Sequence, residues 1–217
     1  MHALPYWQRI TASDMTLFPL MLKLSGRKCI VVGAGKVAAS KIKGLLACGA
    51  RLTVVSPEAG KRIHAYARAG QLVWRRKSFS PRDLGGAFLV IAATDSPAVN
   101  AVVFHSCQIR KILCNSVDDP AHCDFFYPAV VRRGPLQIAI STGGCSPALA
   151  ARLRKDLSRE FGPEWSVFVE HLADLRQQIL RTALSSQRER LLNKIATQKA
   201  FRAFVRARAS RTRTRSL

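Results

Sequence analysis

Three small residues near the start of the chain, Gly33, Gly35 and Ala38, have a spacing that can hold a phosphate-bearing ligand. They follow the apolar run 29–32 and open the stretch 37–48, whose apolar residues recur at helical intervals. In such a strand–turn–helix unit the first glycine permits a tight turn. The second lets the backbone approach a pyrophosphate, and the small third residue lets the helix lie close to the strand. The spacing therefore predicts a dinucleotide site.

The anion would meet free backbone amides at the start of this helix, at Lys36 and Val37. A phosphate loop of the nucleoside-triphosphatase type is excluded, because Lys36 is followed by valine where Ser or Thr is needed for the metal. The remaining alternative is a glycine turn that only packs the strand against its helix.

The second strand lacks the acid that usually binds the adenosine ribose. Ser56 stands at its end, and Glu58 follows two residues later. Lys61 and Arg62 have a spacing that could accept a 2′-phosphate, although helix charges of this kind are more often solvated. Spacing alone therefore leaves the choice between NAD and NADP open.

Polar residues also follow the fourth and fifth expected strands. Thr94 and Asp95 come directly after one, and Asn115 and Asp118 follow the other. Ligands of open parallel sheets bind at the carboxyl ends of the strands. We therefore expect these four side chains at the edge of the sheet that holds the dinucleotide. For Asp118, spacing also permits the alternative of a turn residue ahead of Pro120.

The elements that would position these residues alternate between strand and helix. Apolar strands alternating with helices predict an α/β, Rossmann-like parallel sheet covered on both faces. After Asn115 the pattern changes to a β-hairpin, around Gly134, and then to a C-terminal helical region. The expected strands are 29–32, 52–55, 72–74, 88–92, 112–114, 125–131 and 136–141, and the expected helices are 37–48, 56–69, 96–107, 148–161, 164–184 and 186–207.

Composition bounds the class of protein. The chain has 217 residues, 48% of them hydrophobic, which is enough for a substantial core. No apolar run reaches the roughly 18 to 20 residues that span a bilayer, and the first residues lack the order of a secretory signal, so we predict a cytoplasmic protein with no membrane contact. The six cysteines form no CxxC pair, which indicates neither a disulfide framework nor a zinc site.

The charge is strongly positive, with 35 Lys and Arg against 13 Asp and Glu. The segment 199–217 holds seven basic residues and no acid, but the rest of the chain is basic too. An Arg-rich end of this kind is typical of a solvated, partly disordered arm, and contact with nucleic acid is the less expected alternative. We divide the chain into an extension (1–21), a nucleotide-binding domain (22–118), a dimerisation segment (119–146), a helical domain (147–198) and a basic tail (199–217).

Several motifs fall together in an order that resembles the siroheme-synthase family. They read LKLSGRKCIVVGAGKVAASKIKGLLACGARLTVVSPE, then AATDSPAVN, then CNSVDDPAHCDFFYPAVVRRGPLQIAISTGGCSPALAARLRKDL. The family comprises the precorrin-2 dehydrogenases, some of which are also sirohydrochlorin ferrochelatases. The resemblance covers roughly residues 22–180, and it implies a stand-alone member without the methyltransferase domain fused to some relatives.

The resemblance implies NAD-dependent oxidation of precorrin-2 to sirohydrochlorin, followed in some members by insertion of Fe²⁺ as a substrate. It assigns the general base to the aspartate of the asparagine-x-valine-aspartate stretch, which is Asp118 here. It also implies that Pro57 and Glu58 lie near the adenosine side of NAD. No fixed metal site is implied, and His122-Cys123 is more simply a structural pair on a loop.

The tetrapyrrole substrate is a polycarboxylate, which gives the basic charge a purpose. Candidate substrate-binding residues flank the hairpin and the glycine turn after it, with a solvated hairpin tip and helix face as the alternative for the arginines. They are Arg132, Arg133, Thr142, Gly143, Gly144, Ser146 and Arg152. In one branch of the family a phosphorylatable serine of the active site stands where this chain has Thr142.

The hairpin is too small to be a domain alone, which predicts a homodimer built through it. The rival interpretation from another class is a non-catalytic NAD-binding redox regulator whose basic tail contacts nucleic acid. Such a protein would need Gly33 and Gly35 but not Asp118. No groove-reading helix or aromatic RNA platform accompanies the tail, which disfavours this rival.

Overall fold

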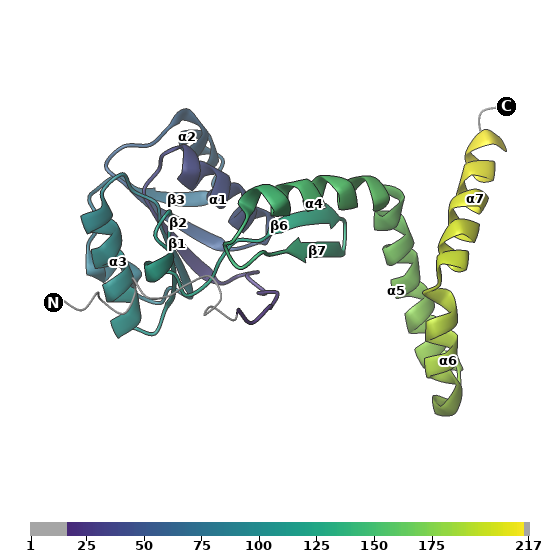
Figure 1. The fold of residues 1–217 in the computed structure, drawn as a ribbon. Helices are drawn as coiled ribbons and strands as arrows, with labels where there is room; N and C mark the ends of the chain where they lie inside the picture. The colour runs from purple at the N-terminus through teal and green to yellow at the C-terminus, as the bar shows by residue number, and fades with distance from the viewer. Residues whose placement is uncertain (1–16, 215–217) are drawn as a thin grey trace. The chain divides into compact units, whose positions relative to one another are not determined.

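The computed structural model describes residues 17–214, which divide into two compact units (Figure 1). The first is Leu17–Tyr127, and the second comprises residues 128–214 of the described chain. The predictions made for residues 1–16 of the extension and 215–217 of the basic tail lie outside the described residues.

The first unit contains a five-stranded parallel sheet with the order β3-β2-β1-β4-β5. β1 lies at its centre, with Ile30 opposite Thr53 on one side and Val90 on the other. The strand order changes direction at β1, so the ends of β1 and β4 form the crevice where such sheets bind ligands. The elements are β1 (Lys28–Val32), α1 (Lys36–Ala47), β2 (Arg51–Val55), α2 (Lys61–Arg68), β3 (Leu72–Arg75), the 3₁₀ turn η2 (Pro81–Leu84), β4 (Leu89–Ala92), α3 (Pro97–Ile109), β5 (Leu113–Ser116) and the 3₁₀ turn η3 (Pro120–His122).

Both faces of this sheet are buried, as its apolar strands predicted. Along β1, Val31 packs into a cluster with Ile42 of α1 and Ile63 of α2. The next residue, Val32, packs into a second cluster with Val103 of α3. Figure 1 shows α3 on one side of the sheet and α1 and α2 on the other. The α/β, Rossmann-like prediction is therefore confirmed.

One helix begins later than predicted. α2 starts at Lys61 rather than near Ser56, because Gly60 takes an extended conformation and stands at the helix N-cap. Residues 56–60 are therefore a loop after β2.

The first unit also includes residues 119–127, which we had assigned to the dimerisation segment. The Asp124 amide donates to the Cys114 carbonyl at 2.8 Å, and Asn115 forms an isolated antiparallel bridge with Cys123. Phe125 packs against the core cluster. These contacts hold the segment to the end of β5.

The second unit pairs an antiparallel hairpin with four helices. Val131 lies opposite Ile138 in the hairpin, and Gly134 supplies the left-handed turn conformation with φ +54°. Among residues 17–214, no helix combines the length and apolar character that crossing a bilayer requires. The elements are β6 (Ala129–Arg133), β7 (Leu136–Ile140), α4 (Pro147–Glu160), α5 (Glu164–Thr182), α6 (Ser185–Ile195) and α7 (Gln198–Thr214).

The basic segment differs from its prediction. The predicted helix 186–207 is two helices, and α7 carries the basic residues where we expected a partly disordered arm. The Phe201 ring stacks on Trp165 of α5 with centroids 4.1 Å apart, and Phe204 stacks on His171 at 5.1 Å. The prediction of disorder is therefore wrong for the described part of this segment, because its two aromatic side chains hold α7 against α5.

Candidate functional site

A cavity of about 800 Å³ opens in the first unit at the carboxyl ends of its central strands. It is bounded by the loops that follow β1, β2, β3 and β4, which the chain order brings to one edge of the sheet. The residues that line it are Val32, Gly33, Ala34, Gly35, Val55, Ser56, Pro57, Glu58, Ala59, Gly60, Ser78, Phe79, Ala93, Thr94, Asp95, Ser96 and Val99.

Gly33 is required by the local geometry. Its φ is +102°, and a Cβ built there would lie 2.2 Å from the Ala93 carbonyl oxygen. Its amide donates to the Val55 carbonyl at 2.9 Å, while the Ala93 amide donates to the Val32 carbonyl at 2.8 Å. The turn thus lies between the ends of β2 and β4, in a space where only glycine fits.

The local geometry does not require glycine at position 35. Gly35 stands at the N-cap of α1 with φ −73°, a value that any residue can adopt, and a Cβ there would meet open space. No side chain caps the helix and its first turn contains no acid, so the amides of Lys36 and Val37 face an uncapped end. An oxyanion fits this position, because the helix dipole and free N–H groups both favour it. The side chains of Lys36 and Val37 are exposed and do not line the cavity.

One wall of the cavity is formed by the loop after β2. The buried Ser56 hydroxyl donates to the Glu58 carbonyl, and the Trp74 indole N–H donates to the Ser56 carbonyl at 3.1 Å. The Ser56 hydroxyl therefore holds the loop, while Pro57 and the exposed Glu58, both predicted to lie near the adenosine of NAD, line the cavity.

The charge of this cavity is the reverse of that of the chain. Its lining carries two carboxylates, those of Glu58 and Asp95, and no Lys or Arg. Lys61 and Arg62, the candidates for a 2′-phosphate, are exposed on α2 and lie outside the lining. A dinucleotide with a free ribose 2′-hydroxyl fits this lining better than one with a 2′-phosphate.

The loop after β4 is held by a residue that the sequence did not reveal. The buried Asn100 accepts hydrogen bonds from the Thr94 hydroxyl at 2.7 Å and amide at 3.2 Å, and donates to the Thr94 carbonyl at 3.1 Å. The Ser96 hydroxyl caps α3 by accepting from the Val99 amide. These bonds position Thr94 and Asp95 at the rim of the cavity.

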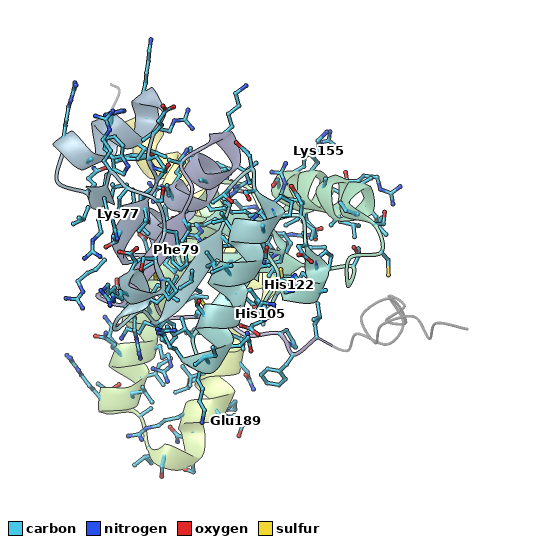
Figure 2. All side chains as sticks on the ribbon, turned by 90° about the vertical axis from the view of Figure 1, so that its left-hand side faces the viewer. Lys77, Phe79, His105, His122, Lys155 and Glu189 are labelled. Atoms are coloured by element: carbon cyan, nitrogen blue, oxygen red, sulfur yellow. The ribbon has the colours of Figure 1, made fainter. Side chains whose placement is uncertain are left out.

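Phe79 is a second residue that was missed. Phe79, labelled in Figure 2, follows β3, and it lines the cavity together with Ser78. An aromatic ring at a dinucleotide site supplies a flat apolar contact for a base. No sequence motif marks it, because its place depends on where β3 ends in the sheet.

Asn115, a predicted cofactor-binding residue, lies in β5, the fifth strand of the sheet. It is buried and lies outside the cavity lining. Its side-chain amide donates to the Phe125 carbonyl at 2.8 Å and to the Cys123 sulfur at 3.2 Å. Asn115 thus braces the loop that follows β5.

That loop presents Asp118. Its side chain is exposed, and its φ of +62° places it in the left-handed region, which is uncommon for a residue other than glycine. The Cys123 thiol ties the loop ends together by donating to the carbonyls of Ser116 at 3.1 Å and Asp119 at 3.2 Å. Burial raises the pKa of this thiol, which keeps it a neutral donor. The loop therefore carries Asp118 at the sheet edge in a conformation that its neighbours enforce.

The neighbouring Asp119 contacts His122, which belongs to a cluster of imidazole and phenyl rings. Its carboxylate lies 2.5 Å from Nδ1 of His122, whose ring also contacts Phe104 and His105. Figure 2 labels the two histidines. Within residues 17–214, no three His, Cys, Asp or Glu side chains are grouped so that they could hold a metal ion. His122 pairs with Asp119, and Cys123 donates to two carbonyls of the loop.

The predicted substrate residues belong to the second unit. Arg133 donates to the carbonyls of Phe161 at 2.7 Å and Ser158 at 2.8 Å, so its guanidinium caps the end of α4. Arg132 donates to Gln137 at 3.2 Å, and Arg152 is exposed on α4. Of these three arginines, Arg133 therefore has the most hydrogen bonds to the backbone of its own unit.

The glycine turn after β7 is ordered by its hydroxyls. The Thr142 hydroxyl accepts from the Ser146 amide at 3.1 Å, and the Ser146 hydroxyl caps α4 by accepting from the Leu149 amide. Gly143 and Gly144 both have positive φ, which gives the turn its left-handed path. The hydroxyl that Thr142 retains at this position thus holds the turn.

The fold and the cavity define a dinucleotide-binding protein of the Rossmann type. A family model described as "Putative NAD(P)-binding" matches residues 20–129, and one described as "Sirohaem biosynthesis protein central" matches residues 133–160. The chain belongs to the siroheme synthase family, as its motifs predicted.

Individual relatives agree with this assignment. The siroheme synthase of Photorhabdus laumondii is 38% identical over 176 residues, which are 81% of this chain and 37% of the relative. Siroheme synthase 1 of Aeromonas salmonicida is 43% identical over 143 residues, 66% of this chain and 31% of the relative. The chain thus spans less than two fifths of the length of these curated relatives.

A solved structure matches over its whole length. SirC, a precorrin-2 dehydrogenase, is 32% identical, with a TM-score of 0.75, and the match covers 93% of this chain and 100% of SirC.

Proposed function

We propose that this protein oxidises precorrin-2 to sirohydrochlorin with NAD⁺ as the acceptor. The observation that carries the proposal is the pairing of an uncapped α1 end at an acid-lined cavity with the Asp118 loop on the same edge of the sheet. The match to SirC over that protein's whole length supports the same reaction.

In this reaction precorrin-2 loses a hydride and a proton, and bound NAD⁺ supplies the hydride acceptor. The amides at the start of α1 and the space over Gly35 would hold the pyrophosphate. Asp118 would accept the proton as general base, and its exposure leaves it open to substrate and solvent. The brace formed by Asn115 and Cys123 keeps that carboxylate at the strand end.

The acidic lining supports NAD⁺ over NADP⁺. A 2′-phosphate would approach the Glu58 carboxylate without a cation in the lining to neutralise it. The ribose hydroxyls of NAD⁺ can instead donate to that carboxylate.

The deciding experiment is anaerobic turnover of enzymatically prepared precorrin-2 with NAD⁺, following sirohydrochlorin and NADH by absorbance. We expect equal amounts of both products from the wild type and a loss of turnover in Asp118→Asn with NAD⁺ binding intact. Asp119→Asn is the matched control, because that carboxylate faces His122. Full turnover by Asp118→Asn would refute the base, and tight NAD⁺ binding without turnover by the wild type would favour the regulator.

Iron insertion is tested in the same preparation, with Fe²⁺ as substrate. Metal insertion displaces two pyrrole protons, which the Asp118 carboxylate could accept. A rate with Fe²⁺ no faster than the spontaneous reaction would remove this second activity.

We also propose a homodimer built through the hairpin of β6 and β7. A two-stranded sheet is marginal alone, and a second copy would extend its burial. A monomer mass by light scattering at micromolar concentration, with activity retained, would refute the dimer. Cytoplasmic location stays a prediction from the sequence.

A further inference from the structure

Lys41 differs from the other lysines of α1. Lys36 and Lys43 are exposed, whereas the Lys41 side chain is half-buried. Its ammonium nitrogen lies 3.7 Å from the centroid of the Tyr127 ring, which is the geometry of a cation–π contact. A buried cation must be stabilised by something, and here an aromatic face does part of that.

The platform beneath this cation is held in place. The Tyr127 ring packs edge-on against Phe125 at 5.7 Å, and Phe125 packs on the core of the sheet. The Phe125 carbonyl is bound by Asn115, the residue that also braces the Asp118 loop. One set of contacts therefore positions both the ammonium and the candidate base.

The Lys41 ammonium also interacts with Asp118. Burial lowers the pKa of Lys41, and the negative charge of Asp118 opposes that change. Within residues 17–214, no carboxylate lies within 4 Å of the ammonium. No carboxylate of the described residues therefore pairs with the Lys41 ammonium, and its N–H donors remain available.

A half-buried ammonium with available donors is a receptor for a carboxylate. We propose that Lys41 binds a peripheral carboxylate of the tetrapyrrole beside Asp118, with Tyr127 holding the ammonium in place. This assignment rests on the proposed function, since it takes the substrate to be a polycarboxylate. It makes Lys41 a substrate-binding residue that comes from the same helix whose first turn faces the dinucleotide.

The test is a titration that needs no turnover. Sirohydrochlorin is added anaerobically to the full chain and its binding followed by quenching of tryptophan fluorescence, beside a separate NAD⁺ titration. We expect Lys41→Met to weaken tetrapyrrole binding at least tenfold, the loss of one charge-assisted contact, and to leave NAD⁺ binding unchanged. Lys43→Met is the matched control, because it removes an exposed cation two residues further along the helix.

Tyrosine variants separate the anchor from simple packing. Tyr127→Phe keeps the ring and should bind tetrapyrrole like the wild type, whereas Tyr127→Leu should weaken binding in the same direction as Lys41→Met. Lys41→Arg, which keeps the charge, should recover most of the affinity. A folded Lys41→Met protein that binds sirohydrochlorin like the wild type would overturn the assignment, as would an equal loss in Lys43→Met.

The outcome is distinguishable from failure of the proposed function. If the wild type oxidises precorrin-2 while Lys41→Met binds tetrapyrrole normally, only the Lys41 assignment fails. If the wild type binds sirohydrochlorin but does not oxidise precorrin-2, the dehydrogenase fails and the titration still decides Lys41. A wild type that binds no tetrapyrrole would overturn both.

Discussion

Alanine at Gly33 and alanine at Gly35 should damage the protein in opposite ways, although the two glycines belong to one motif. At Gly33 the added Cβ would lie 2.2 Å from the Ala93 carbonyl oxygen, and the φ of +102° is strained for any L side chain. Left-handed strain alone costs about 1–2 kcal/mol, and the clash is with backbone that cannot rotate away. We expect Gly33→Ala to lose at least about 3 kcal/mol of unfolding free energy, which is a large share of a typical domain's stability.

At Gly35 the same methyl group meets open space and an ordinary φ of −73°. The free energy of unfolding should therefore stay within about 0.5 kcal/mol of the wild-type value, or rise slightly. The methyl would instead occupy the space that a bound pyrophosphate needs. Overpacking by one methyl costs about 1–3 kcal/mol, which corresponds to roughly 5- to 150-fold weaker NAD⁺ binding.

The assay pairs urea unfolding with calorimetric titration of NAD⁺ for each variant. Gly44→Ala is the control, because Gly44 lies within α1 but outside the cavity, with no atom near its added Cβ. It should stabilise the protein by about 0.5–1 kcal/mol and leave NAD⁺ binding unchanged. Gly35→Ala with wild-type NAD⁺ affinity would refute the placement of the pyrophosphate, and a fully stable Gly33→Ala would refute the turn geometry.

Three further predictions concern charge and burial in the same unit. Glu58→Gln should raise the ratio of kcat/KM for NADP⁺ to that for NAD⁺ by about 5- to 10-fold, because it removes a carboxylate that repels a 2′-phosphate; an unchanged ratio would show that Glu58 does not face the ribose. Burial alone would raise the pKa of Asp83, but hydrogen bonds from Lys77, the Ser80 amide and Arg75 outweigh it, so this pKa lies below its ordinary 3.8. The resulting stabilisation of the wild type is present above the pKa of Asp83 in the unfolded state and is lost as pH falls through its pKa in the folded state. At pH 7 the unfolding free energy of Asp83→Asn should therefore lie about 3 kcal/mol below that of the wild type, and the two values should converge in acid. Ser116→Ala should raise the free energy of unfolding by about 1 kcal/mol in a denaturant titration, because the Ser116 hydroxyl is buried without a hydrogen-bond partner in the described structure; a loss of stability would reveal a partner.

Local pattern was sufficient for the sheet of the first unit. Short apolar runs bounded by glycines and polar residues leave little choice but buried parallel strands, and the five predicted strands 29–32 to 112–114 all exist. The start of α2 was less certain, since Ser56-Pro57 looks like a helix cap. There the Ser56 hydroxyl bonds to the Glu58 carbonyl instead, which stabilises a loop. Competition between two local hydrogen bonds is not decided by the residue types alone.

The basic segment was misjudged because composition was weighed over periodicity. Arg, Ser and Thr predict a solvated arm, but Phe201 and Phe204 lie three residues apart and so share one helix face. That face packs against the rings of Trp165, Phe168 and His171 on α5. Sequence shows that such a face exists, but not which element covers it.

For the candidate site, motif spacing predicted the backbone turn at the start of the first helix. It did not predict the side chains that contribute to the cavity from distant parts of the sequence. Gly33 and Gly35 were found because their roles depend on one turn. Phe79 and Asn100 were missed because each contributes to the cavity from a different part of the chain, and only the strand order brings those parts together. Asn115 was placed at the correct sheet edge, yet its amide is turned to the loop it braces.

The distribution of charge in this chain suits the proposed reaction, which needs separate binding sites for NAD⁺ and for a polycarboxylate substrate. A chain with a formal net charge of +22 would be expected to line a ligand cavity with cations, yet the charged side chains that line this cavity are the two carboxylates of Glu58 and Asp95. NAD⁺ can be held there by backbone amides, which bind a pyrophosphate without attracting other polyanions as strongly as Lys or Arg would. The cations outside the cavity, the proposed Lys41 among them, are then left for the polycarboxylate substrate. Adding a lysine to the cavity rim, as in Asp95→Lys, should therefore make the tetrapyrrole compete with NAD⁺, a competition that the wild type should not show in titrations with both ligands.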